Sequence, residues 1–183
     1  MKRVALVVAL FGVGVAQDAV AGPVNASTWY QFCFSGVGNF ATSNVGCFAP
    51  APGVVAADDP AWTFTSATSF WFQLQDLYVS GTRFSLFADA VFVGQTSDVP
   101  TGAACGADPE VCAADPGISS GSFHFGPGTY SFMIRYDAGP ATSGAGAFKI
   151  EPASDAVPEP ATLGLMALGL VGIGVARRRA RNT

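Results

Sequence analysis

Apolar and polar residues alternate along much of the chain, which is the pattern of half-buried β-strands. The alternation holds from Phe70 to Leu74 and then shifts by one position before Leu77, which predicts a β-bulge near Gln75–Asp76. The clearest strand is residues 130–136, where bulky side chains take one face and smaller or polar ones the other: Tyr130, Phe132, Ile134 and Tyr136 against Ser131, Met133 and Arg135.

Turn residues divide this pattern into short strands. Residues 82–94 read as two strands about Ala88-Asp89-Ala90, and residues 122–132 as two more about Gly126-Pro127-Gly128. Further strands are expected in residues 28–34, 61–64 and 145–150, and no stretch between the two ends offers three helical turns with an apolar stripe. The fold expected for residues 22–152 is therefore all-β, an antiparallel, jelly-roll-like β-sandwich.

The N-terminal residues 1–21 have the three parts of a secretory signal peptide. Lys2 and Arg3 precede an apolar run over residues 4–16, and a short polar step leads to Ala19-Val20-Ala21. Ala19 and Ala21 are the small residues that signal peptidase accepts, so we predict cleavage after Ala21 and export.

Export to an oxidising compartment bears on whether the cysteines form disulfides. An even number of cysteines in an exported domain indicates disulfides. Three pairings are open, and the favoured one joins Cys33 to Cys47 and Cys105 to Cys112, because each bond closes a short loop rich in Gly, Pro and Ala. These loops belong to two long connections, residues 38–60 and 96–121. The single His124 makes a zinc site of sulfur ligands improbable.

The domain between the ends is acidic. From Gly22 to Ala156 there are three basic and eleven acidic residues, a net charge of −8. Such a surface repels phosphate backbones, so no nucleic-acid partner is expected.

Few residues suggest catalysis, and none is assigned as catalytic. His124 falls opposite Phe123 and Phe125 in its strand, so it should face solvent as an ordinary surface residue. Calcium is the one metal that the loops leave open, and Trp71, opposite in phase to its neighbours, would suit sugar binding if exposed. The weak calcium candidates are Asp58, Asp59, Asp108, Glu110 and Asp115.

The C-terminal region has its own order of features. Residues 153–160 form a linker ending in Pro158-Glu159-Pro160, residues 161–176 are uncharged, and a basic tail follows over residues 177–183. As a helix the uncharged run spans about 24 Å, short of the roughly 30 Å hydrocarbon core. We expect a marginal transmembrane helix, with the tail held in the cytoplasm as a stop-transfer signal by Arg177, Arg178, Arg179 and Arg181.

This arrangement of Val157-Pro158-Glu159-Pro160, an apolar helix and an arginine cluster resembles PEP-CTERM sorting domain-containing proteins of Gram-negative bacteria. More loosely, the strand pattern of residues 76–152 is similar to some of their ectodomains. The resemblance implies that exosortase, a membrane enzyme, recognises and processes the motif, and that the protein has a link to exopolysaccharide and biofilm matrix.

The expectation is thus a non-enzymatic, exported protein that is held transiently in the inner membrane and then sorted to the cell surface or extracellular matrix. Its role would be structural or adhesive. The alternative is a carbohydrate-binding module, with calcium assistance left open, and a glycan-active enzyme stands third.

Overall fold

The structure is a computed structural model that describes residues 22–98, 101–102 and 104–153. The predicted signal peptide with Ala19 and Ala21, and all residues from 154 onward, lie outside these ranges.

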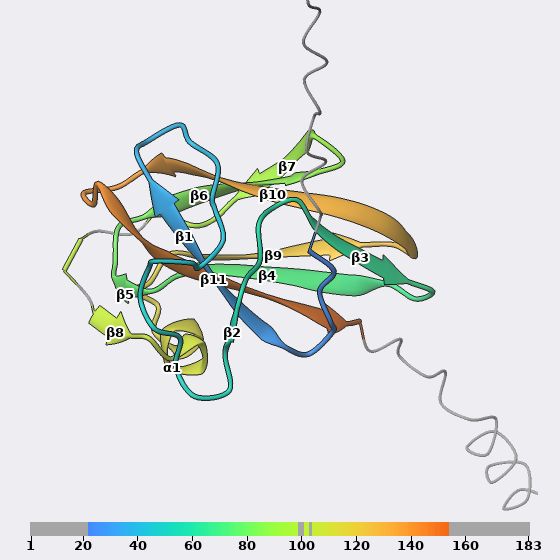
Figure 1. Cartoon of the computed structure of the whole chain (residues 1–183), viewed down its shortest axis with the longest axis horizontal. Coiled ribbons are helices and arrows are strands. Elements are labelled where there is room, and N and C mark those ends of the chain that lie inside the picture. Colours follow the sequence, from blue (N-terminus) through green and yellow to red (C-terminus); the bar gives the residue numbers. More distant parts are fainter. Residues whose placement is uncertain (1–21, 99–100, 103, 154–183) are drawn as a thin grey trace, which may run out of the picture.

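The described residues form two packed sheets (Figure 1). A five-stranded sheet has the order β2-β1-β11-β4-β9, a four-stranded sheet has the order β3-β10-β6-β7, and β5 pairs with β8 in a small third sheet. The elements are β1 (Trp29–Ser35), β2 (Val55–Ala56), β3 (Trp62–Ser66), β4 (Phe70–Asp76), β5 (Tyr78–Val79), β6 (Arg83–Ala88), β7 (Val91–Gln95), β8 (Ala104–Gly106), α1 (Pro109–Ala114), β9 (Ser120–Phe125), β10 (Gly128–Ala138) and β11 (Ser143–Pro152).

The winding of the main strands confirms the predicted fold. Without the short β2, β5 and β8, eight strands remain, and the sheet order β1-β11-β4-β9 faces β3-β10-β6-β7. Counted in chain order these are strands 1-8-3-6 over 2-7-4-5, the double Greek key of a jelly roll. All their pairings are antiparallel, whereas β2 adds to β1 in parallel.

Aromatic rings fill the space between the sheets. Phe72 of β4 stacks on Phe148 of β11 at 5.2 Å and meets Phe132 of β10 at 4.6 Å, and all three are fully buried. A glycine accommodates one large ring of β1, since a Cβ on Gly146 would lie 2.5 Å from Phe32, its partner across the strands. These contacts come from alternate positions of their strands, as the sequence pattern predicted.

Two turns were predicted from local sequence, and only one of them joins strands that pair with each other. β6 and β7 pair about Asp89-Ala90, whose φ angles of 50° and 64° suit a two-residue hairpin turn. The turn before Gly128 is also present, but β9 and β10 do not pair with each other; β9 joins β4 and β10 joins β3 and β6. The chain therefore crosses between the sheets there, as a jelly roll requires.

The predicted bulge near Gln75–Asp76 is wrong. β4 keeps an uninterrupted register with β11 up to Asp76 and with β9 up to Gln75. The change of phase arises because the chain leaves the strand at Leu77, and Tyr78 takes a φ of 67°. Leu77 is buried in a second cluster with Trp29, Cys112, Ile118 and Ala147.

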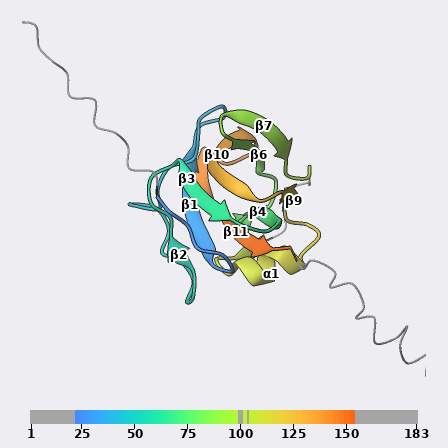
Figure 2. The same cartoon turned by 90° about the vertical axis from the view of Figure 1, so that its right-hand side faces the viewer.

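Helix α1 lies against the outer side of the five-stranded sheet (Figure 2), and its Cys112 belongs to that second cluster. The Asp108 side chain accepts a hydrogen bond from the backbone N–H of Glu110, and Pro109 occupies the first turn of the helix. The disulfide Cys105–Cys112 ties the helix to β8, and Cys33–Cys47 ties the loop after β1 back to that strand. Both predicted disulfides are therefore confirmed.

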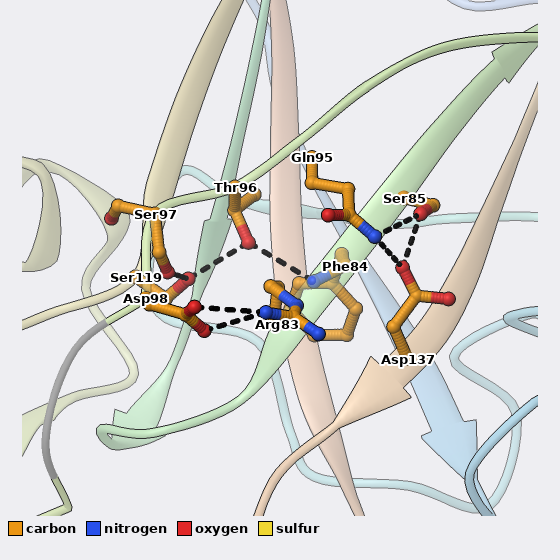
Figure 3. Close-up of polar contacts among 9 residues, drawn as sticks. All are labelled: Arg83, Phe84, Ser85, Gln95, Thr96, Ser97, Asp98, Ser119 and Asp137. Carbon is orange, nitrogen blue, oxygen red and sulfur yellow. Dashed lines mark hydrogen bonds and ion pairs between the residues drawn. The ribbon is translucent and has the colours of Figure 1, made fainter.

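A polar clasp joins the edges of the two sheets near β7 and β9 (Figure 3). The Ser119 hydroxyl donates to Thr96 Oγ1 at 2.8 Å and to the Ser97 carbonyl, and Thr96 Oγ1 accepts from the Phe84 N–H at 3.0 Å. Next to the clasp, Arg83 pairs with Asp98 at 2.8 Å. The clasp thus joins the edge strands β7 and β9 at one end.

Candidate functional site

The outer face of the five-stranded sheet carries an ordered set of polar and aromatic side chains beyond the part that α1 covers. Strand register places Trp71 between His124 and Glu151, and places Gln73 between Ser122 and Lys149. Residues directly opposite on one face of paired strands have Cβ atoms about 4.5–5.5 Å apart. The six side chains therefore form two adjacent rows, which we name the Trp71 face: Trp71, Gln73, Ser122, His124, Lys149 and Glu151.

Trp71 is the main aromatic surface of this face. Its neighbours Phe70 and Phe72 are completely buried, so the alternation of β4 directs the indole outward, where it is 41% exposed. The indole and the His124 imidazole lie 4.8 Å apart between centroids. A large apolar ring exposed to solvent and fixed on a regular strand is available to stack on a ligand.

Lys149 is fixed from several directions beside Trp71. Its amine donates to Glu151 at 2.9 Å and to Glu110 of α1 at 3.1 Å, and lies 4.7 Å from the centre of the Trp29 ring. Partial burial favours the neutral amine, but the hydrogen bonds that the amine donates to Glu151 and Glu110 outweigh it and raise the pKa of Lys149. The network thus holds the Lys149–Glu151 pair charged and rigid.

Glu110 links the helix to the sheet. It accepts a hydrogen bond from Trp29 Nε1 at 2.7 Å, and this bond, followed by that from Lys149, lowers the pKa of its carboxyl. Between α1 and the sheet lies a groove of about 370 Å³, lined in part by Gln73, Gln75, Ala113, Ser120 and Ser122. The groove continues the Trp71 face with amide and hydroxyl groups.

The five calcium candidates do not converge. Asp108 and Asp115 accept backbone N–H groups of residues 110 and 117 at 2.9 and 2.8 Å, which is helix-cap and turn chemistry. Glu110 binds Trp29 and Lys149, while Asp58 and Asp59 lie exposed in the connection before β3. Within the described ranges no group of three His, Cys, Asp or Glu side chains is placed to hold a metal.

His124 is exposed, as predicted, and Phe125 on the opposite side of β9 is buried. Its ring contacts Trp71. The sequence singled out Trp71 and His124 but not their partners Gln73, Ser122, Lys149 and Glu151. Those four lie on the same face by alternation, yet only the pairing of β4 with β9 and β11 brings them together.

Asp76 is the most perturbed carboxyl with a described environment. It is 1% exposed, and its two oxygens accept the backbone N–H groups of Leu77 and Thr82, each at 3.0 Å. Desolvation raises its pKa from 3.8 to about 7, against the lowering effect of these hydrogen bonds. Asp76 fastens the turn between β4 and β6 and faces the core side of the loop, away from the Trp71 face.

Comparison with known proteins bears on the region after the domain. Residues 156–180 match the family described as the PEP-CTERM protein-sorting motif. The chain carries a PEP-CTERM sorting motif. This motif marks an exported protein that exosortase processes and that reaches the cell surface.

The chain was also compared with curated sequences and with solved structures. No curated protein sequence matches it. Among solved structures, it is similar to the pre-peptidase C-terminal domain of collagenase from Bacillus anthracis, with 12% identity and a TM-score of 0.38 over 72% of this chain and 94% of that one.

The predicted sorting and anchoring residues lie outside the described ranges. They are Pro158, Glu159 and Pro160, the span 161–176, and Arg177, Arg178, Arg179 and Arg181. Among the residues described, no helix has the length and apolar character needed to cross a membrane.

Proposed function

We propose that this PEP-CTERM protein is a non-enzymatic adhesin of the cell surface or extracellular matrix that binds exopolysaccharide through the Trp71 face. The observation that carries the proposal is the exposed indole of Trp71, set in strand register beside His124 and Glu151. An aromatic platform on a rigid sheet is what a sugar ring, apolar on its C–H face, needs for stacking.

The surroundings of Trp71 supply the polar half of sugar recognition. Gln73 and Ser122 offer both donors and acceptors for hydroxyl groups, and the groove beside α1 continues this lining. Lys149 and Glu151 are paired, so the face contributes little net charge although the domain around it is acidic. A flat face with one aromatic ring and a polar surround fits adhesion along a chain better than enclosure of a substrate.

Substitution Trp71→Ala tests this function. Exopolysaccharide purified from the native host is immobilised, and binding of the full chain in mild detergent is measured. Loss of one central aromatic contact should weaken binding by about tenfold or more.

Phe48→Ala is the matched control, because Phe48 is a 50% exposed aromatic ring outside the Trp71 face. Equal binding by the wild type, Trp71→Ala and Phe48→Ala proteins would reject the Trp71 face as the binding surface. Repeating the measurement with calcium and with a chelator tests whether calcium assists.

We also propose that the segment 161–176 is a temporary anchor. In this scheme the arginine tail holds the chain in the inner membrane while exosortase acts at Pro158-Glu159-Pro160, and the signal peptide is removed after Ala21. The sorting motif at residues 156–180 supports this sequence of events. The C-terminal mass of the protein isolated from its host should end near the motif; recovery of Arg181 and Thr183 in the surface protein would contradict the proposal.

A further inference from the structure

The outer face of the opposite sheet has a second organised surface. Phe84 and Leu86 of β6 face the core, so Ser85 and Phe87 point to the other side, where Ser85 is buried beneath its neighbours and Phe87 is partly exposed. Their cross-strand partners are Gln95 and Phe92 of β7 and Arg135 and Met133 of β10, and Phe40 bridges to Arg135 from the loop after β1. We name this surface the Phe87 face: Phe40, Ser85, Phe87, Phe92, Gln95, Arg135 and Asp137.

Phe87 lies at the centre of an aromatic row. Its ring is 5.6 Å from that of Phe40 and 5.8 Å from that of Phe92, in edge-to-face contact with both. Phe40 is 44% exposed and Phe92 53% exposed. The guanidinium of Arg135 lies 5.1 Å from the centre of the Phe87 ring.

Polar groups hold one end of this row in place. Asp137 accepts hydrogen bonds from Gln95 Nε2 at 2.8 Å and from the Ser85 hydroxyl (Figure 3). It also accepts one from Arg135 Nε at 2.7 Å. Burial alone would raise the pKa of Asp137, but the Ser85, Arg135 and Gln95 contacts outweigh it and lower the pKa. Asp137 and Arg135 therefore form a fixed, balanced ion pair.

The two outer faces repeat one chemistry. Each has an exposed aromatic surface, a glutamine in the adjacent row, and a carboxylate-paired cation over an aromatic ring. The two cation–π pairs of the described residues are divided between the faces, Arg135 over Phe87 on one and Lys149 over Trp29 on the other. Arg135 and Asp137 balance on the Phe87 face, and Lys149 offsets the charge of Glu151 on the Trp71 face while also pairing with Glu110 of α1, whereas the domain carries −8.

Charge complementarity selects the occupant. A polyanionic chain would be repelled by the acidic domain, and a charge-balanced aromatic surface suits an uncharged glycan. At the edge of the rings, the terminal nitrogens of Arg135 provide hydrogen-bond donors for hydroxyl groups, and the amide oxygen of the exposed Gln95 provides an acceptor.

We infer that the Phe87 face is a second binding surface for a neutral polysaccharide, so that one molecule bridges two glycan chains. The inference rests on the proposed function of the Trp71 face. Because the faces belong to opposite sheets of the sandwich, they point away from each other and cannot hold the same short stretch of chain. Bridging by single molecules would turn an adhesin into a cross-linker of the matrix.

A two-layer capture assay tests the bridge. The neutral exopolysaccharide fraction of the host is immobilised, the full chain is bound in mild detergent, and fluorescently labelled soluble polysaccharide of the same fraction is added. Wild-type protein should recruit the label. Phe92→Ala keeps the Trp71 face and should hold the immobilised layer as the wild type does. Trp71→Ala can hold the layer only through the Phe87 face, which we expect to bind it about tenfold more weakly, so this variant is applied at a higher concentration to reach equal loading. For both variants recruitment per bound molecule should fall by about tenfold or more.

Phe92 is half-exposed, so its truncation leaves the core intact; Phe87→Ala serves as a second variant, with thermal melting checked for both. Mixing Phe92→Ala with Trp71→Ala protein distinguishes bridging by one molecule from bridging by a dimer. If one molecule bridges, mixing cannot restore recruitment of the label. If a dimer bridges, mixing restores recruitment, and that result overturns the inference. Recruitment by Phe92→Ala and Phe87→Ala at the wild-type level also overturns it. Wild-type protein that binds the first layer but recruits nothing refutes the second face alone, whereas failure to bind the first layer refutes the proposed function.

Discussion

The buried carboxyl of Asp76 should make the stability of the domain depend on pH. The side chain is shielded from water at the end of β4, and its pKa is raised from 3.8 to about 7, chiefly by desolvation. The Tyr136 hydroxyl belongs to the same region, since its pKa is raised by burial and then by the charge of Asp76. The folded protein therefore holds a proton on Asp76 at pH values where the unfolded chain has released it.

The sign and size of the effect follow by linkage. A group whose pKa is higher in the folded state contributes stability that is complete below about pH 4 and is lost as pH rises to about 7. Each pKa unit corresponds to about 1.4 kcal/mol, so the rise from 3.8 to about 7 corresponds to about 4 kcal/mol as an upper value. Glu110 and Asp137, whose pKa values are lowered, contribute in the opposite direction over the acidic range.

Comparison of the wild type with Asp76→Asn isolates the contribution of this residue. The asparagine keeps the size of the side chain but does not titrate, and the other carboxyls cancel in the difference. Urea unfolding of both proteins, with disulfides intact and tryptophan fluorescence as the probe, should show the free-energy difference moving by several kcal/mol in favour of Asp76→Asn between about pH 4 and pH 8. A difference that stays constant over that range would show that Leu77 and Thr82 keep the carboxylate charged, and would refute the reasoning.

Two further predictions concern the disulfides and the hydrophobic core. Replacing Cys33 and Cys47 by serine should lower the free energy of unfolding by about 3 kcal/mol, and replacing Cys105 and Cys112 should lower it by about 2 kcal/mol, because the bonded cysteines are 14 and 7 positions apart. Urea unfolding measures both losses of stability, and a larger loss for the shorter loop would contradict the loop-entropy account. Phe148→Ala should cost about 3–5 kcal/mol in the same assay, since the fully buried ring contacts partners from both sheets, and a loss below about 1 kcal/mol would mean that the site collapses around the deletion.

Sequence reasoning succeeded where structure depends on neighbouring residues. Alternation placed the faces of β4 and β10, and the Asp89-Ala90 turn and the two short disulfide loops were found from local composition. The short helix α1 was not expected, although Asp108-Pro109 is a helix-start signal. Six residues are too few to show a helical stripe.

The functional surfaces could not be assembled in the same way. Phe87 can be placed outward from its strand pattern. Its nearness to Phe40 depends on two distant pairings, the bridge between Phe40 and Arg135 and the pairing of β10 with β6. Similarly, Lys149 reaches Trp29 only because β11 pairs with β1. The acidic loop residues, which we expected as calcium candidates, do not converge on one site. Asp108 and Asp115 instead accept backbone hydrogen bonds within their own turns.

The central position of β11 has a consequence for the order of events during export. This strand is the last of the domain in the chain, yet it pairs with β1 on one side and β4 on the other, so the five-stranded sheet has no continuous middle without it. With the N-terminus leading, residues 143–152 reach the far side of the membrane after every other strand. The sandwich can therefore close only when translocation is almost complete, and until then the chain stays unfolded enough to be translocated. Closure of the sheet and arrival of the sorting motif at the membrane thus become nearly simultaneous.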